Sequence, residues 1–155
     1  MRAFGLEVSS GFRRAYPYEE WFLAPPEDLR SSSYLEVAAT EFECQGLELD
    51  WTGVCWGGDL TFDQARAQWS LRRLIGSRWT RIKDPTTRQY VLNKYRVLLT
   101  RARKGMIIWV PSGHDADSTT MSDSKDETAT YLQACGVPML TPLNRAVRAG
   151  AIALE

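Results

Sequence analysis

Apolar residues occur in short runs along this chain, and polar or glycine-containing segments separate them. Three runs have the length of a strand, at residues 34–40, 51–56 and 106–110. The third is uninterrupted, which predicts a strand buried on both faces. The clearest helical pattern spans residues 89–103, where apolar side chains recur on one stripe: Val91, Tyr95, Leu98 and Ala102. Gly105 is expected to end this helix.

Weaker patterns fill the rest of the chain. Helices are predicted at residues 64–74, at residues 126–134 with Gly136 as the cap, and from Thr141 onward. A short strand is predicted at residues 6–10, an irregular segment at 11–26, a loop or short helix at 41–50, and a polar loop at 112–125. Apolar strands separated by helices predict an α/β fold with a mainly parallel sheet.

Length and composition narrow the class of protein. The 155 residues fit one domain with a sizeable core. Neither a signal peptide nor an apolar stretch of membrane-spanning length occurs in the sequence, so we expect a cytoplasmic protein with no membrane partner. Three cysteines without a C-x-x-C pair, and one histidine, predict buried free thiols and no metal site.

The charge is balanced overall but unevenly distributed. Residues 64–104 hold twelve basic residues and one acid, whereas residues 1–63 hold twelve acids and four basic residues. Such a basic segment is suited to facing phosphates, or else to forming a solvated face that pairs with the acidic part. Trp69 and Trp79 are interleaved with these cations, so they are candidates for stacking on nucleic-acid bases.

The segment at residues 40–50 offers the first candidate chemistry. Gly46 allows a sharp turn or a close approach to a ligand. Gln45 supplies an amide, and the carboxylates of Glu48 and Asp50 suit a sugar hydroxyl better than a phosphate. The alternative is an ordinary connection between two strands.

The segment at residues 93–105 offers the second. On a helix, Arg101 would lie at the edge of the apolar stripe, and Arg96 and Arg103 would lie nearer to solvent. A guanidinium at such an edge is placed to reach phosphate oxygens across a cleft. The alternative is a basic, exposed face on a core helix.

Together the two segments resemble a known family. The letters QGLELD at residues 45–50, followed about 50 residues later by VLLTRAR at residues 97–103, are similar to motifs V and VI of superfamily 1 helicases. Thr40 stands six residues before Gly46, where UvrD-like enzymes carry a threonine. The surrounding residues, from about 6 to 137, resemble the bacterial Schlafen-like DNA/RNA helicase domain proteins.

The resemblance implies a fold and a role for each matched residue. It implies a RecA-like (P-loop NTPase-like) three-layer sandwich without its first strand, so that residues 1–155 form a single, partial second RecA-like domain. Arg101 matches the arginine that contacts the γ-phosphate of ATP on the other domain. Glu48 matches a ribose contact and Gly46 a glycine beside the nucleotide. Gln45 and Thr40 match positions that couple the nucleotide and nucleic-acid sites.

The resemblance also implies what the chain lacks. The sequence contains no G-x-x-x-x-G-K-[ST] phosphate loop, so we expect no ATP hydrolysis by this chain alone. ATP and Mg²⁺ are expected only in a complete two-domain helicase or translocase. The expected partners are the first RecA-like domain, in cis or in trans, and single-stranded nucleic acid. The alternative is a non-enzymatic module that binds nucleic acid or a protein.

Overall fold

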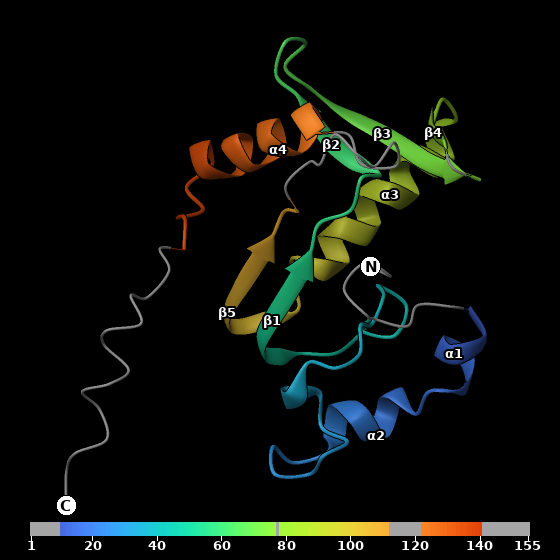
Figure 1. Cartoon of the computed structure of the whole chain (residues 1–155), viewed down its shortest axis with the longest axis vertical. Helices are drawn as coiled ribbons and strands as arrows, with labels where there is room; N and C mark the ends of the chain where they lie inside the picture. The colour runs from blue at the N-terminus through green and yellow to red at the C-terminus, as the bar shows by residue number, and fades with distance from the viewer. Residues whose placement is uncertain (1–9, 77, 112–121, 141–155) are drawn as a thin grey trace, which may run out of the picture. The chain divides into compact units, whose positions relative to one another are not determined.

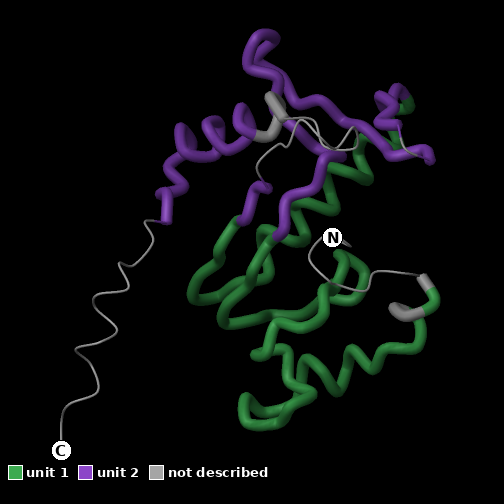
Figure 2. Tube along the Cα trace, in the orientation of Figure 1, with its two compact units in different colours: residues 1–54, 84–108 green, residues 55–83, 109–155 purple. Residues whose placement is uncertain are grey.

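A computed structural model describes residues 10–76, 78–111 and 122–140 (Figure 1). The described elements form an α/β arrangement with one parallel pair of strands and one antiparallel sheet of three strands. The chain divides into two compact units, which are coloured separately in Figure 2. Unit 1 combines residues 1–54 with 84–108, and unit 2 combines residues 55–83 with 109–155.

Unit 1 contains the parallel pair and, among its described residues, four helical segments. Its elements are α1 (Ser10–Ala15), α2 (Tyr18–Leu23), a 3₁₀ turn (Ser32–Tyr34), β1 (Leu49–Cys55), α3 (Pro85–Leu98) and β5 (Ala102–Trp109). β1 and β5 run side by side in the same direction (Figure 1). The backbone N–H of Leu49 donates to the carbonyl of Arg101 at 2.9 Å, at the start of both strands. The predicted strand at residues 51–56 is thereby confirmed.

Helix α3 confirms the clearest helical pattern, but it begins at Pro85 and ends at Leu98, whereas residues 89–103 were predicted. Asp84 caps the helix by accepting a hydrogen bond from the backbone N–H of Thr87 at 2.7 Å, and Pro85 follows at the first helical position. The helix ends at Leu98, so Ala102 opens strand β5 and Gly105 lies inside that strand. The prediction that Gly105 ends the helix is wrong, because residues from 102 onward pair with β1 instead.

The N-terminal part of unit 1 is helical, where an irregular segment was predicted. Helix α2 and the residue just after α1 form a cluster of rings in edge and tilted contact: Tyr16, Tyr18, Trp21 and Phe22. Trp21 is buried among them. Burial of these rings stabilises the helical segment. The prolines suggested an irregular segment, but Pro17 stands just before α2 and does not interrupt it.

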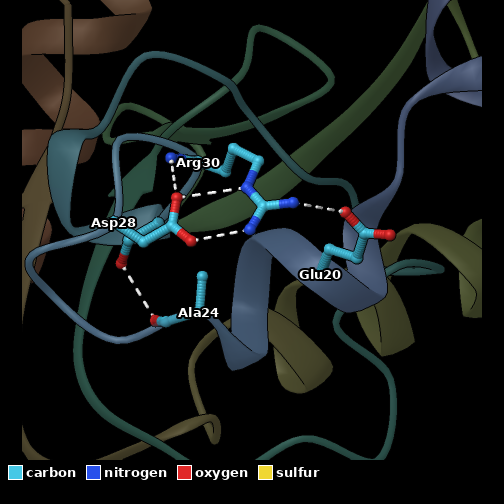
Figure 3. Close-up of polar contacts among 5 residues, drawn as sticks. Glu20, Ala24, Asp28 and Arg30 are labelled. Atoms are coloured by element: carbon cyan, nitrogen blue, oxygen red, sulfur yellow. Dashed lines mark hydrogen bonds and ion pairs between the residues drawn. The ribbon is translucent and has the colours of Figure 1, made fainter.

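A charged turn follows α2 and is shown in Figure 3. The guanidinium of Arg30 bonds to Asp28 at 2.8 Å and reaches Glu20 at 3.3 Å. The side-chain and backbone hydrogen bonds from Arg30 lower the pKa of Asp28 to about 2. This cluster is exposed and local, so it shapes the turn rather than forming a site.

The predicted strand at residues 34–40 is wrong. Ser31 caps a 3₁₀ turn at Ser32–Tyr34, and the turn closes with Leu35 in the left-handed region at φ 56°. A left-handed residue cannot continue an extended strand, and Leu35 is 77% exposed. The expected parallel sheet is therefore limited, among the described strands, to the β1–β5 pair.

Unit 2 contains the antiparallel sheet. Its elements are β2 (Leu60–Asp63), β3 (Gln68–Ile75), β4 (Arg78–Arg81) and α4 (Ser122–Ala134). The predicted helix at residues 64–74 is wrong, because most of this segment is strand β3. The carboxylate of Asp63 accepts from the backbone N–H of Arg66 at 3.0 Å and closes a hairpin turn, in which Ala67 takes φ 49°. The register then places Leu71 opposite Leu60, and both are buried.

Aromatic rings and one threonine join the sheet of unit 2 to helix α4. Tyr131 of α4 stacks on Phe62 with centroids 4.0 Å apart and meets Trp69 edge-on at 5.1 Å. The fully buried Thr128 accepts a hydrogen bond from the backbone N–H of Phe62 at 2.9 Å. The predicted cap at Gly136 is confirmed by its φ of 95° just beyond the helix.

Several other predictions are settled only in part. Cys44 is buried as expected, whereas Cys55 and Cys135 are exposed, and all three are free thiols. Strand β5 is not buried on both faces, since Ile107 and Trp109 are exposed. Residues 122–125 of the predicted polar loop belong to α4, whereas residues 6–9, residues 112–121 and the helix from Thr141 lie outside the described residues. No described helix is long and apolar enough to cross a membrane.

Candidate functional site

The two candidate segments meet in unit 1, at the start of the parallel strand pair. Residues 40–48 lead into β1 and residues 99–101 lead into β5. The backbone bond between Leu49 and Arg101 holds the starts of the two strands together. The Arg101 side chain adds a second link, because its Nη1 donates to the carbonyl of Leu47 at 3.0 Å. Parallel pairing thus joins segments that are 54 residues apart in sequence.

Arg101 lies beyond the end of α3, not on the helical stripe where the sequence pattern placed it. Its Nε donates to the carbonyl of Val97 at 3.0 Å, and its Nη2 donates to the hydroxyl of Thr100 at 3.1 Å. A guanidinium has five N–H donors. Bonds among the described residues use three of them, which leaves one N–H on each terminal nitrogen. That pair is sufficient for a two-point contact with a phosphate.

The loop before β1 is built by a threonine–glutamate pair. The backbone N–H and the hydroxyl of Thr40 both donate to the carboxylate of Glu43. The T-x-x-E spacing of a capping box could have revealed Glu43, but the sequence interpretation did not single it out. The turn ends at Gly46, whose φ of 84° is a left-handed conformation that favours glycine. Thr40 therefore helps to fold the loop that carries the matched residues.

Three of the matched residues face solvent. Gln45, Gly46 and Glu48 are exposed. Within the described part of the chain, the side chains of Gln45 and Glu48 have no hydrogen-bond or ion-pair partner. A carboxylate and an amide in this state are available to an external ligand. The loop thus presents the side chains of Gln45 and Glu48 to solvent and buries Cys44.

Cys44 has no catalytic character in this setting. Its thiol is buried, and burial raises its pKa, although the nearby positive charge of Arg101 acts in the opposite direction. A thiol with a raised pKa stays protonated near neutral pH and is a poor nucleophile and metal ligand. Among the described residues no group of histidine, cysteine and acidic side chains is arranged to hold a metal ion.

Asp50 is engaged by two cations of the neighbouring strand. Arg103 donates to one carboxylate oxygen at 2.8 Å, and Lys104 donates to the other at 2.7 Å. This geometry gives Arg103 a structural role that the sequence interpretation left open. It also occupies the Asp50 carboxylate, so Glu48 is the better candidate for a sugar hydroxyl. The hydrogen bonds from Lys104 and Arg103 lower the pKa of Asp50.

We expect Asp50 to contribute a small, acid-sensitive part of stability. Because its folded-state pKa lies below 3.8, the contribution is present above that unfolded value and is lost as the pH falls through the folded pKa. Asp50→Asn should therefore lower the melting temperature slightly at pH 7, and this difference should shrink as the pH falls below 3.8. Thermal melts of both proteins from pH 7 to pH 2 measure this difference. A difference that grows at low pH would contradict the ion pairs.

The two tryptophans proposed to stack on bases lie in unit 2 and are packed. Trp69 stacks on Trp56 with centroids 6.0 Å apart and contacts Phe62 at 5.4 Å. The ring of Trp79 lies so close to Gly58 that an added Cβ would sit 2.8 Å from it. These contacts favour a core role for both rings, and their binding of nucleic acid stays a prediction.

The described geometry is an α/β arrangement in which one arginine joins two segments that are far apart in the sequence. A model of the Schlafen group 3 DNA/RNA helicase domain matches residues 7–112, which include both segments. The chain belongs to this family. No curated protein matches the chain. No solved structure matches it either.

Proposed function

We propose that this chain is the second RecA-like half of an ATP-dependent nucleic-acid helicase or translocase. The observation that carries the proposal is the link from Arg101 to the Leu47 carbonyl, which joins the two motif-like segments at one place. Membership of a helicase-domain family supports it. In this proposal Arg101 acts on ATP held by a first RecA-like domain.

Arg101, Glu48 and Gly46 each have a chemical task in this proposal. The two remaining N–H groups of Arg101 stabilise negative charge on the transferred phosphoryl group, a contribution worth about 10³–10⁵ in rate when an arginine finger is present. The Glu48 carboxylate accepts a hydrogen bond from the ribose. Gly46 lets the backbone approach the nucleotide without a side chain in the way.

In this proposal Mg²⁺ is held by the first domain and not by the described residues of this chain. A magnesium ion prefers oxygen ligands, usually one or two carboxylates together with substrate phosphates. Two carboxylates lie close to Leu47 in sequence. Glu48 is assigned here to the ribose, and Asp50, on β1, is held by two cations. The ion would therefore be held by the first domain, and this chain contributes charge through Arg101.

The chain by itself is expected to release no phosphate from ATP. Phosphate release is expected only when a first RecA-like domain is present. Phosphate release is measured with Mg²⁺ and single-stranded DNA or RNA, for the chain alone and after adding a first domain that carries a phosphate loop. The control is the first domain mixed with the Arg101→Ala chain. Turnover by the chain alone that is lost on mutating this chain would overturn the proposal, as would a first domain that gains nothing from the chain.

One observation favours the non-enzymatic alternative. Three N–H donors of Arg101 are already used within the chain, which is also what a purely structural clamp requires. In that case the chain is a module that binds nucleic acid or a protein, and Arg101 holds the loop in place. The Arg101 variants described in the Discussion separate the two functions.

A further inference from the structure

The distal part of the β3–β4 hairpin concentrates positive charge. Residues 72–83 contain five cations and no acid: Arg72, Arg73, Arg78, Arg81 and Lys83. β2 pairs with β3 as far as Leu71, and the backbone N–H of Arg72 still donates to the carbonyl of Asp59 at 2.9 Å, so β3 is paired with β4 alone from Arg73 onward. Gly76, at φ 60°, lies in the turn between the two strands. The cations therefore lie on a two-stranded projection of unit 2, called here the basic hairpin (residues 72–83).

The register distributes these cations over both faces of the basic hairpin. Arg72 stands directly opposite Arg81, and Ile75 stands opposite Arg78. Side chains alternate along a strand, so Arg73 and Arg78 share one face, and Arg72 and Arg81 share the other. A ligand that follows the hairpin meets a cation on whichever face it takes.

Four of these five cations have no acidic partner among the described residues. Arg73, Arg78, Arg81 and Lys83 are exposed, and no described carboxylate forms an ion pair with any of them. Like charges directly opposite each other destabilise a strand pair, which makes the Arg72–Arg81 pairing unfavourable by itself. By contrast, the exposed side chains of Arg30, Arg66 and Arg103 each form an ion pair with an acidic residue. The basic hairpin is therefore suited to a polyanion that supplies the missing charge.

Two aliphatic side chains at the tip narrow the class of polyanion. Leu74 is 48% exposed and Ile75 is 52% exposed, immediately beside the arginines. Cations with adjacent apolar groups match a strand that offers both phosphates and uncovered base faces. Base faces are uncovered in a single strand and stacked away in a duplex. An acidic protein or a duplex would use the cations but not the tip.

We propose that the basic hairpin binds single-stranded nucleic acid, with arginines on the phosphates and the aliphatic tip on unstacked bases. This deepens the proposed function by naming the nucleic-acid surface of the same module. It places that surface on β3 and β4 rather than on the packed rings of Trp69 and Trp79. It requires neither ATP nor a first domain, so it is tested separately from the nucleotide site.

The test is binding of the full 155-residue chain to labelled oligonucleotides by fluorescence anisotropy at several salt concentrations. The probes are a thymidine 20-mer, a uridine 20-mer and a mixed-sequence 20-base-pair duplex. We expect tighter binding to a single strand than to the duplex. If about four phosphates are neutralised, log K falls against log salt with a slope near −3. The triple change Arg73→Ala, Arg78→Ala and Arg81→Ala should make that slope shallower by about 2 and raise Kd about tenfold or more at low salt.

Three comparisons make the result specific. The control triple Arg30→Ala, Arg66→Ala and Arg96→Ala removes the same charge from exposed positions elsewhere and should leave the slope unchanged. The triple change of Arg73, Arg78 and Arg81 to lysine should keep the slope, since it keeps the charge. Leu74→Ser with Ile75→Ser should reduce the preference for a single strand while leaving the slope intact. Thermal melts confirm that each variant is folded.

Several outcomes would overturn the proposal. These are no binding at low salt, equal weakening by the two alanine triples, a preference for the duplex, and equal competition by poly-glutamate, which would indicate any polyanion. None of these outcomes bears on ATP turnover with a first domain, so failure here leaves the proposed nucleotide site standing.

Discussion

Arg101→Ala is expected to lower ATP turnover by about 10³–10⁵ when the chain acts with a first RecA-like domain. That range corresponds to roughly 4–7 kcal/mol of transition-state stabilisation, which is the contribution of an arginine finger. The reason is geometric: each terminal nitrogen keeps one N–H beyond the bonds to Leu47 and Thr100. Arg101→Lys should restore little activity, because a point charge cannot reproduce the planar fork.

The internal bonds of Arg101 require a stability measurement beside the kinetic one. The links to Leu47 and Val97 are lost in Arg101→Ala, at a cost of about 1–2 kcal/mol for hydrogen bonds of this kind. We therefore expect a modest fall in melting temperature together with the large fall in kcat. Near-normal turnover, or a loss of activity explained fully by unfolding, would make Arg101 a structural clamp and favour the non-enzymatic module.

Leu71→Ala is expected to destabilise the chain by about 2–5 kcal/mol, the largest effect on stability predicted here. Leu71 is 1% exposed and stands opposite Leu60 in the sheet of unit 2. Truncation leaves a cavity in the core. The strand cannot fill it by sliding along its neighbours, since a one-residue slip would turn every side chain to the other face of the sheet. Urea unfolding followed by tryptophan fluorescence measures the loss.

Leu74→Ala is the matched control for that measurement. It is the same change on the same strand, three residues further along, at a side chain that is half-exposed. We expect a cost within about 0.5 kcal/mol, as for surface substitutions away from packed features. Equal destabilisation by both changes would contradict the burial pattern of β3.

Local signals in the sequence were sufficient for several elements. Asp84 and Pro85 are a local start signal for α3, because they satisfy or avoid donors that no helix can pair internally, but the apolar pattern placed the start at residue 89 and this signal was not used. Gly136 marks the end of α4 for a similar local reason. The motif letters around Gly46 and Arg101 indicated the family, which the match to residues 7–112 then established.

Other features depended on contacts between distant residues. The segment at 64–74 has residues compatible with a helix, and its strand state comes from pairing with β2 and β4 and from the rings that pack on it. Arg101 and Ala102 are not helical, because the chain there pairs with β1 to form β5. The apolar pattern of residues 89–103 carries no information about that pairing.

The sequence by itself determined the cap of α4 at Gly136, the run that became β1, and the concentration of cations between residues 64 and 104. Only the tertiary structure decided that Arg101 bonds to Leu47 and that Asp50 is held by Arg103 and Lys104. It also decided that four of those arginines lie on the two strands of one hairpin, with Lys83 just beyond it. The physical reason is that caps and turns act within a few residues, whereas strand pairing and burial join residues whose separation along the chain carries no local signal.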